Sequence, residues 1–175
     1  MTSIELIASD LTTLDAQRDD LLVLGILEDE RPLTGLAGLV DWRLCGALSR
    51  WIVSGFATGS WGESVLYPSS HRLGQRATLV LGLGTRPQLR TDRIHDAARR
   101  ASEVMKGLGS KRMTCDLLGL DRMPTPVENT LPGLLEVLQT CEPIERATFA
   151  VQPKQFDLVR GVMDRFGRRG FPQTS

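Results

Sequence analysis

A run of seven residues, Leu21–Leu27, contains only apolar side chains and one glycine. A strand exposed on one face alternates apolar and polar residues, so an unbroken run indicates a strand that is covered on both faces. A second such run, Ala77–Leu83, is interrupted only by a threonine and a glycine. The two runs predict buried central strands of a sheet with helices on both sides.

The rest of the chain alternates between strand and helix patterns. We expect strands over Ser3–Ala8 (at a sheet edge), Glu63–Tyr67, Lys111–Leu118 and Arg146–Val151, and helices over Leu36–Ile52, Thr91–Leu108, Leu134–Thr140 and from Pro153 to a cap at Gly167. Ser9–Asp20 is expected to be a polar turn and Gly119–Thr130 a loop. This order predicts an α/β fold, a three-layer α/β/α sandwich with a mixed, mostly parallel sheet. We expect a single domain over residues 1–170, followed by a tail at 171–175.

The segment after the first buried run carries a long apolar stripe. Apolar residues recur three and four positions apart from Leu36 to Ile52, which is typical of one helix lying on a core. Thr34 is its expected N-cap, and Gly55 its exit into the glycine-rich loop Gly55–Gly62. In the later helix, Asp96 and Arg100 are four residues apart, which favours an exposed ion pair.

Several segments of this chain occur in a recognisable order. They are Asp20–Leu27, Gly46-Ala-Leu-Ser49, Gly59-Ser-Trp-Gly-Glu63, Arg76–Gly84, Ile94–Leu108 and Glu145–Arg168. Together they resemble the N-terminal domain of the leucine aminopeptidase (M17) family over nearly the whole chain. The resemblance implies a macro-domain-like fold.

The same resemblance carries expectations about function. In this family, catalysis belongs to a C-terminal domain with two metal ions, and its Asn-Thr-Asp-Ala-Glu-Gly-Arg type motif does not occur in this sequence. The resemblance therefore implies a stand-alone accessory domain that is not an enzyme, and it carries over no catalytic or metal-binding residue. In the family, this domain helps to build or regulate the oligomer, and in some members it contributes to DNA binding.

Acidic and histidine residues do not form a metal-ligand pattern. The clusters Asp19-Asp20 and Glu28–Glu30 have no histidine near them in sequence, so we expect solvated turns rather than a metal site. His71 and His95 each stand alone and are expected at the surface.

Nucleophile patterns are also missing. Neither Ser49 nor Ser64 lies in a nucleophile elbow. Cys45, Cys115 and Cys141 form neither a disulfide framework nor a metal motif, and we expect Cys45 and Cys115 to be buried as small hydrophobic residues. No catalytic residue, metal or cofactor is predicted.

Glycines supply the candidate ligand-binding positions, which are Gly55, Gly59, Gly62, Gly82 and Gly84. A glycine-rich turn after a buried strand can hold phosphate. The same glycines are equally explained by tight turns at positive φ. The motifs with which macro domains bind ADP-ribose are not evident, so nucleotide or ADP-ribose binding is an alternative function.

Aromatic residues supply the candidate interface. Trp42 lies about 100° from the apolar stripe of its predicted helix, and Trp61 lies in the glycine-rich loop. Each is either a core residue or an interface anchor. With Leu36, they mark the expected contact surfaces, Arg31–Trp42 and Gly55–Gly62. The main prediction is thus a protein-interaction or self-assembly module, with a protein partner or a homo-oligomer.

Charge and hydropathy restrict the remaining partners. Arginines gather in sequence at Arg86, Arg90, Arg93, Arg99 and Arg100, but the net charge is zero, so a DNA-binding accessory role is a further, less favoured alternative. No apolar run reaches the roughly 20 residues that cross a bilayer, and we see no signal peptide, so a cytoplasmic location without a membrane partner is expected.

Overall fold

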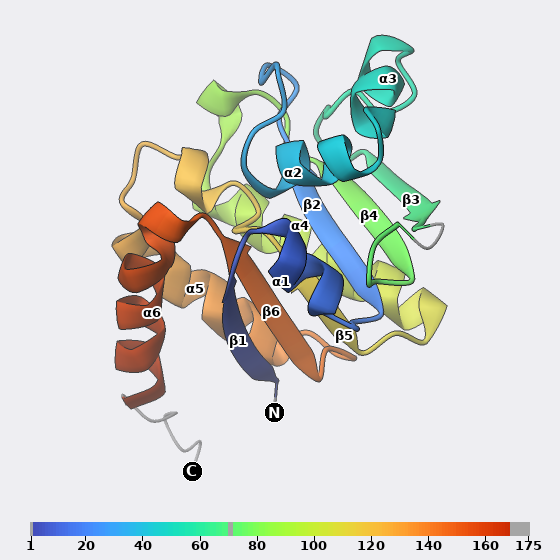
Figure 1. Ribbon diagram of the computed structural model, residues 1–175. Helices are drawn as coiled ribbons and strands as arrows, with labels where there is room; N and C mark the ends of the chain where they lie inside the picture. Colours follow the sequence, from blue (N-terminus) through green and yellow to red (C-terminus); the bar gives the residue numbers. More distant parts are fainter. Residues whose placement is uncertain (1, 70–71, 169–175) are drawn as a thin grey trace.

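The computed structural model describes residues 2–69 and 72–168 (Figure 1). The strands are β1 (Ser3–Ala8), β2 (Leu21–Ile26), β3 (Ser64–Pro68), β4 (Ala77–Gly82), β5 (Arg112–Cys115) and β6 (Arg146–Val151). The helices are α1 (Leu11–Ala16), α2 (Gly35–Arg43), α3 (Ala47–Val53), α4 (Thr91–Leu108), α5 (Val127–Thr140) and α6 (Pro153–Arg168), with short 3-10 turns η1 (Arg86–Gln88) and η2 (Leu120–Arg122). The predicted tail at 171–175 and His71 lie outside the described residues.

The described strands form one sheet in the order β1-β6-β5-β2-β4-β3. β3 pairs antiparallel with β4, and the other described pairs are parallel. The predicted mixed, mostly parallel sheet is confirmed, with β1 at an edge and the apolar run of β2 inside.

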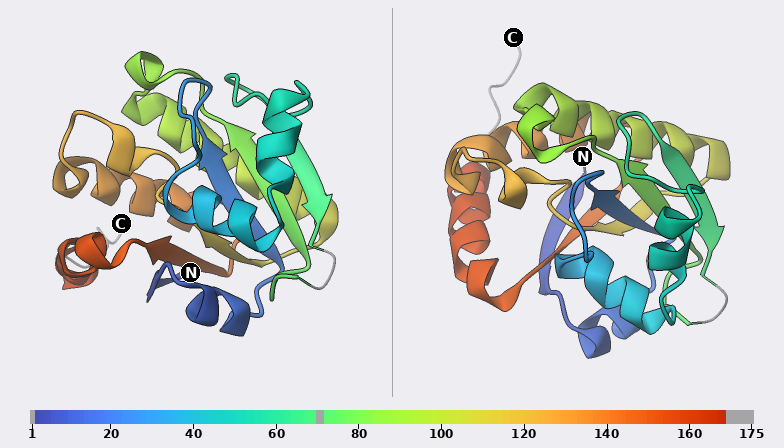
Figure 2. Two further views of the ribbon diagram at one scale, coloured as in Figure 1. Left: turned by 45° about the horizontal axis from the view of Figure 1, so that its top comes forward. Right: turned by 90° about the horizontal axis from the view of Figure 1, so that it is seen from above.

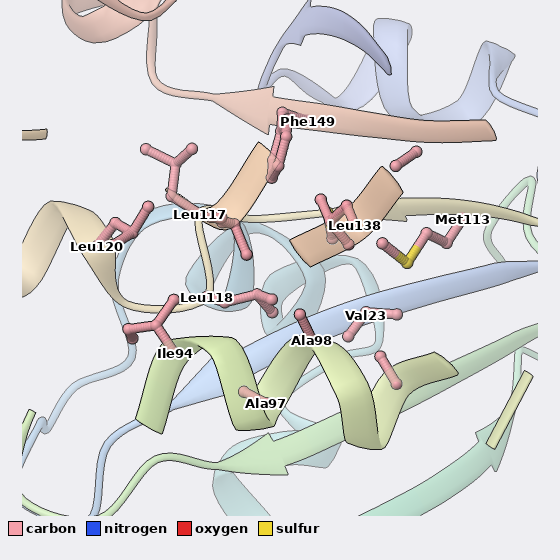
Figure 3. Close-up of a cluster of buried hydrophobic side chains, with 14 of the residues drawn as sticks. Val23, Ile94, Ala97, Ala98, Met113, Leu117, Leu118, Leu120, Leu138 and Phe149 are labelled. Carbon is pink, nitrogen blue, oxygen red and sulfur yellow. The ribbon is translucent and has the colours of Figure 1, made fainter. Parts of the chain in front are cut away.

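Two buried clusters cover the two faces of the sheet. Alternate residues of β2 divide between them, so that Leu21 and Val23 face one cluster while Leu22 and Leu24 face the other. Figure 2 shows α4 and α5 on one side of the sheet and α1 and α2 on the other. In the first cluster, Val23 of β2 lies close to Ala98 of α4, and Phe149 of β6 lies on the side of Leu117 and Leu138 (Figure 3). This arrangement is the predicted three-layer sandwich.

The predicted helix over Leu36–Ile52 is wrong, because the structure divides it into α2 and α3. Cys45 and Gly46 adopt left-handed backbone conformations, with φ of 56° and 77°, and this ends α2. The side chain of Asp41 then caps the new helix, accepting a hydrogen bond of 3.0 Å from the backbone N–H of Ser49 and another from its hydroxyl. The turn also leaves Cys45 exposed, contrary to prediction, whereas Cys115 is buried as predicted.

Other segment boundaries also differ from prediction. The expected polar turn before β2 contains α1, whose N-cap Asp10 accepts a hydrogen bond of 2.8 Å from the backbone N–H of Thr13. α5 begins at Val127 and includes Pro132, because burial of Val127 and Leu131 outweighs the donor that proline lacks. α6 continues through Gly167 to Arg168 and is therefore not capped at Gly167.

Candidate functional site at the carboxyl edge of the sheet

The sheet has a topological switch point between β2 and β5. These neighbours are parallel and in register from Leu21–Met113 to Val23–Cys115. After β2 the chain runs to α2 and α3 on one face and on towards β3 and β4, whereas after β5 it runs to α5 on the other face and on to β6. In open α/β sheets, ligands bind outside the carboxyl ends of strands at such a point.

Beyond Val23 and Cys115, hydrogen bonds from side chains take the place of backbone pairing between β2 and β5. Asp116, directly after β5, accepts a hydrogen bond of 3.1 Å from the backbone N–H of Gly25 in β2 and one of 2.8 Å from that of Leu118. Arg122 donates a hydrogen bond of 2.8 Å from Nη1 to the carbonyl of Gly25. The gap between the two strand ends is thus closed by the chain's own polar groups.

Arg122 is also the centre of a buried ion cluster. Its Nε lies 3.2 Å from Oε2 of Glu30, and its Nη2 lies 3.9 Å from Oδ2 of Asp116. The side chains of all three residues are at most 9% exposed. Thr34 occupies the predicted N-cap position of α2, but its hydroxyl donates to Glu30 instead of capping the helix.

Burial alters the acidity of this cluster. Removal from water raises the pKa of Asp116 to about 6, although the nearby Arg122 charge and the backbone donors of Leu118 and Gly25 act in the opposite direction. The Asp116 carboxyl therefore titrates closer to neutral pH than an ordinary aspartate.

The space next to this cluster is small. It lies between the N-terminus of α2 at Gly35, the side chains of Asp121 and Arg122, and the start of α6 at Gln152 and Gln155. Its volume is about 10 Å³, close to what one water molecule needs. This space alone is too small for an organic ligand of nucleotide size, but it adjoins an open hollow of about 610 Å³ that shares Gly35 and Gln152 with it.

Sequence patterns do not single out Glu30, Asp116 or Arg122. They predict a solvated turn at Glu30 and a longer strand that includes Asp116, and both predictions are wrong. The available indication is that Asp116 is the first charged residue after an apolar strand core, at the strand end where sites form.

The structure brings together some of the candidate glycines. A Cβ on Gly82 would lie 2.0 Å from the carbonyl oxygen of Ser60, and one on Gly59 would lie 2.8 Å from the backbone carbon of Leu27. Gly84 donates a hydrogen bond of 2.9 Å from its N–H to the carbonyl of Gly59. Backbone of the same chain therefore occupies the space beside Gly59 and Gly82, and the side chains of Arg93 and Gln88 occupy the space beside Gly84.

The remaining candidate glycines lie apart from that contact. Gly55 and Gly62 have positive φ, and no described atom lies within 4 Å of where a Cβ would be. Their ligand-binding role stays a prediction, and the positive φ supplies a structural reason for glycine at both positions.

Trp61 packs beside α4. The guanidinium groups of Arg93 and Arg100 lie 4.6 and 4.7 Å from its ring centroid, and the tryptophan is 37% exposed. Arg100 donates to the carbonyls of Glu63, at 3.2 Å, and Gly82, at 3.1 Å. The side chain of Arg100 therefore fastens the glycine-rich loop to α4.

The predicted ion pair between Asp96 and Arg100 is wrong. Asp96 instead pairs with Arg99 at 2.7 Å, because the carbonyls of the loop and the Trp61 ring engage the guanidinium of Arg100. Partial burial lowers the pKa of Arg100.

The other two candidate interface residues differ in exposure. Leu36, in the first turn of α2, is 3% exposed and packs into the second core cluster, whereas Trp42 of the same helix is 70% exposed. Among the arginines that are close in sequence from Arg86 to Arg100, Arg90 pairs with Asp92, and the backbone N–H of Arg86 donates to Asp29. This local pairing offsets part of the positive charge there.

The Asp19-Asp20 cluster is not a solvated turn. Asp19 is buried, where its carboxylate lies 2.5 Å from Nη2 of Arg146 and accepts a hydrogen bond of 2.8 Å from Thr114. Over residues 2–69 and 72–168, no three His, Cys, Asp or Glu side chains converge as a metal site would require. None of the helices in those ranges is both long and apolar enough to cross a bilayer.

Comparison with solved structures shows the class of fold. The Oceanobacillus iheyensis macrodomain with ADP gives a TM-score of 0.71 at 12% identity, covering 95% of this chain and 93% of that one. The macro domain of ganglioside induced differentiation associated protein 2 gives 0.70 at 14% identity, over 99% and 86%. A tomato leucine aminopeptidase mutant gives 0.63 at 16% identity, over 95% of this chain and 36% of that one. The chain therefore has a macrodomain-like α/β fold.

Within that class, the family is defined by sequence. The model of the cytosol aminopeptidase family, N-terminal domain, matches residues 23–135, which is most of the chain. The chain belongs to this family, as predicted. A probable cytosol aminopeptidase of Alkaliphilus oremlandii (strain OhILAs) is 27% identical over 107 residues, covering 61% of this chain and 21% of that protein. The match thus spans about a fifth of that relative.

Proposed function

We propose that this chain is a non-catalytic module that contacts protein surfaces, in the first instance a second copy of itself. The carrying observation is the distribution of exposed large apolar side chains, which among the described residues are Trp42, Val53, Phe56, Trp61, Leu66, Leu108 and Leu158. The first five lie between residues 42 and 66, in the region that runs from α2 to β3. These five side chains are close in sequence; large exposed apolar side chains are typical of interaction sites, and tryptophan is enriched among binding hot spots.

Phe56 is suited to act as an anchor. Its ring packs edge-on against Trp51, with centroids 5.9 Å apart, and Trp51 packs in the same way against Tyr67 of β3 at 4.8 Å. An exposed ring that is already held in place loses little conformational freedom on binding. Leu36 is left out of the proposed surface because it is buried.

The absence of catalysis and the location belong to the same proposal. The family match covers the N-terminal domain, and the acidic residues at the switch point are engaged by Arg122 and by backbone donors. The relative's name as a cytosol aminopeptidase supports a cytoplasmic location.

Small-ligand binding is the second candidate, favoured by the likeness to a macrodomain whose structure holds ADP. The gap between the ends of β2 and β5 argues against it, because Arg122 and its carboxylate partners leave about 10 Å³ there, and the adjoining hollow of about 610 Å³ at Gly35 and Gln152 is the remaining place for such a ligand. Titration with ADP should leave the backbone amide resonances of Gly35, Leu117 and Gln152 unchanged. A localised, saturable change at these amides would favour the ligand-binding alternative.

Sedimentation velocity over a range of concentrations tests the main proposal. We expect the unmodified chain to form larger species as concentration rises, and the double variant Trp42→Ala, Phe56→Ala to shift towards monomer. Leu158→Ala removes an exposed apolar side chain of α6 and should have no effect. Equal association of the double variant and the unmodified chain would refute the proposed surface.

A further inference from the structure

A second polar hollow lies at the opposite edge of the sheet, near the starts of β2 and β4. Its lining comes from α1, the loop between α1 and β2, α2 and the turn before β4, and consists of Asp15, Arg18, Arg43, Arg72, Leu73 and Gly74. Its volume is about 310 Å³. It shares no residue with the switch point described above.

The lining carries an excess of positive charge. Arg43 pairs with Asp15, its Nη2 lying 2.9 Å from Oδ2. Arg18 donates to backbone carbonyls of Asp15 and Gln17, and Nη1 of Arg72 lies 2.9 Å from the sulfur of Cys45. Among the described residues, Arg18 and Arg72 therefore have no carboxylate partner, and two positive charges of the lining are not offset within it.

Two polar atoms of the Arg43–Asp15 pair are buried and have no described hydrogen-bond partner. They are Nε of Arg43 and Oδ1 of Asp15. Nε of arginine is a donor with a fixed direction, so it needs an acceptor atom. Because both atoms are buried, the groups available to an anion in the hollow are the exposed guanidinium groups of Arg18 and Arg72.

We propose that this hollow binds a small phosphate-bearing anion. A phosphate group carries a charge of about −1.5 to −2 near neutral pH, which matches the excess of the lining. Its oxygens accept from several guanidinium forks at once, a geometry for which arginine is suited. A single carboxylate offers half that charge and two oxygens, so it offsets the arginines less completely. This site is independent of the apolar surface proposed above.

Thermal unfolding at fixed ionic strength and pH 7.5 tests the site. Inorganic phosphate should raise the melting temperature above its value in sodium chloride, since a ligand that binds the native state stabilises it. Pyrophosphate should raise it further, and acetate should act like chloride. The double variant Arg18→Gln, Arg72→Gln should lose this shift, whereas Arg160→Gln, which changes an exposed arginine of α6, should keep it.

Two results would overturn the proposal. One is a melting temperature in phosphate equal to that in chloride. The other is an unchanged phosphate shift in the double variant. If loss of the Arg18 contacts to α1 unfolds the double variant, Arg72→Gln alone serves the same purpose, and it should reduce the shift at a given phosphate concentration.

Discussion

At the scale of single residues, the ion cluster at the switch point is the most consequential feature. Arg122 joins Glu30, from the loop after β2, to Asp116, at the end of β5, and it also holds the backbone of Gly25. Breaking a buried pair by removing one partner typically costs about 3–5 kcal/mol, because the other charge stays buried. The cluster therefore closes the gap between the carboxyl ends of β2 and β5, a position at which open α/β sheets bind ligands.

Asp116 should make the stability of the protein depend on pH. Its pKa is raised to about 6 in the folded state, so between pH 4 and 6 the folded chain binds more protons than the unfolded chain. The free energy of unfolding contributed by this group should fall as pH rises through that window, by about 3 kcal/mol. Urea unfolding of the unmodified chain and of Asp116→Asn measures it.

The difference between the two chains isolates this group from other carboxylates. The unmodified chain should be more stable relative to Asp116→Asn at pH 4 than at pH 7. A difference in unfolding free energy that is the same at both pH values would show that Asp116 does not titrate in this window.

Residue-scale contacts are the part of the site that sequence reasoning cannot supply. Asp116 contacts Gly25, which is 91 positions earlier in the chain. Nothing local to either residue specifies this pairing, since it arises when the sheet places β5 beside β2. Asp19 and Arg146 illustrate the same limit, because a carboxylate in a polar turn becomes buried through a partner from β6.

At the scale of elements, the sequence predicts strands better than helix ends. The apolar runs of β2 and β4 and the alternation of β1 are direct consequences of their places in the sheet. The break between α2 and α3 escapes the pattern because buried Leu44, Ala47 and Leu48 continue the apolar stripe across it. The available indications are Gly46 and the pair formed by Asp41 and Ser49.

Substitution by alanine should have opposite effects at two glycines, one at the break between α2 and α3 and one inside α4. Gly46 has φ of 77°, so Gly46→Ala should destabilise the fold by about 1–2 kcal/mol. Gly107 is helical in α4, and no described atom lies within 4 Å of where its Cβ would be, so Gly107→Ala should stabilise the fold by about 0.5–1 kcal/mol. Urea unfolding measures both, and a neutral or stabilising Gly46→Ala would contradict the left-handed turn.

Gly82 connects the glycine-rich loop to β4. A Cβ there would lie 2.0 Å from the carbonyl oxygen of Ser60, so Gly82→Ala should force the loop to move and destabilise the protein by about 1–3 kcal/mol. Gly107→Ala is the matched control for an alanine that meets no neighbouring atom. Gly62→Ala does not serve this purpose, because the positive φ of Gly62 would add backbone strain. Thermal unfolding of Gly82→Ala with unchanged stability would contradict the close packing of this loop.

At the scale of the whole molecule, the fold separates two kinds of surface. The gap between the carboxyl ends of β2 and β5 is closed by the chain's own side chains, while large apolar side chains are exposed from α2 to β3. The sequence identifies Trp42 and Trp61 as candidates and includes Phe56 only as part of the Gly55–Gly62 surface. The place of the Phe56 ring depends on its packing against Trp51, which in turn packs against Tyr67. Exposure of this kind is a property of the assembled layers, so a helical stripe alone does not predict it.

The most direct measurement of the central claim is the molar mass of the purified chain, by size-exclusion chromatography with light scattering over a range of concentrations. The chain mass is 19.3 kDa. We predict a mass that rises with concentration towards an integer multiple of this value, and that falls back to the chain mass in Trp42→Ala, Phe56→Ala. A mass equal to that of one chain at every concentration would contradict self-assembly through this surface.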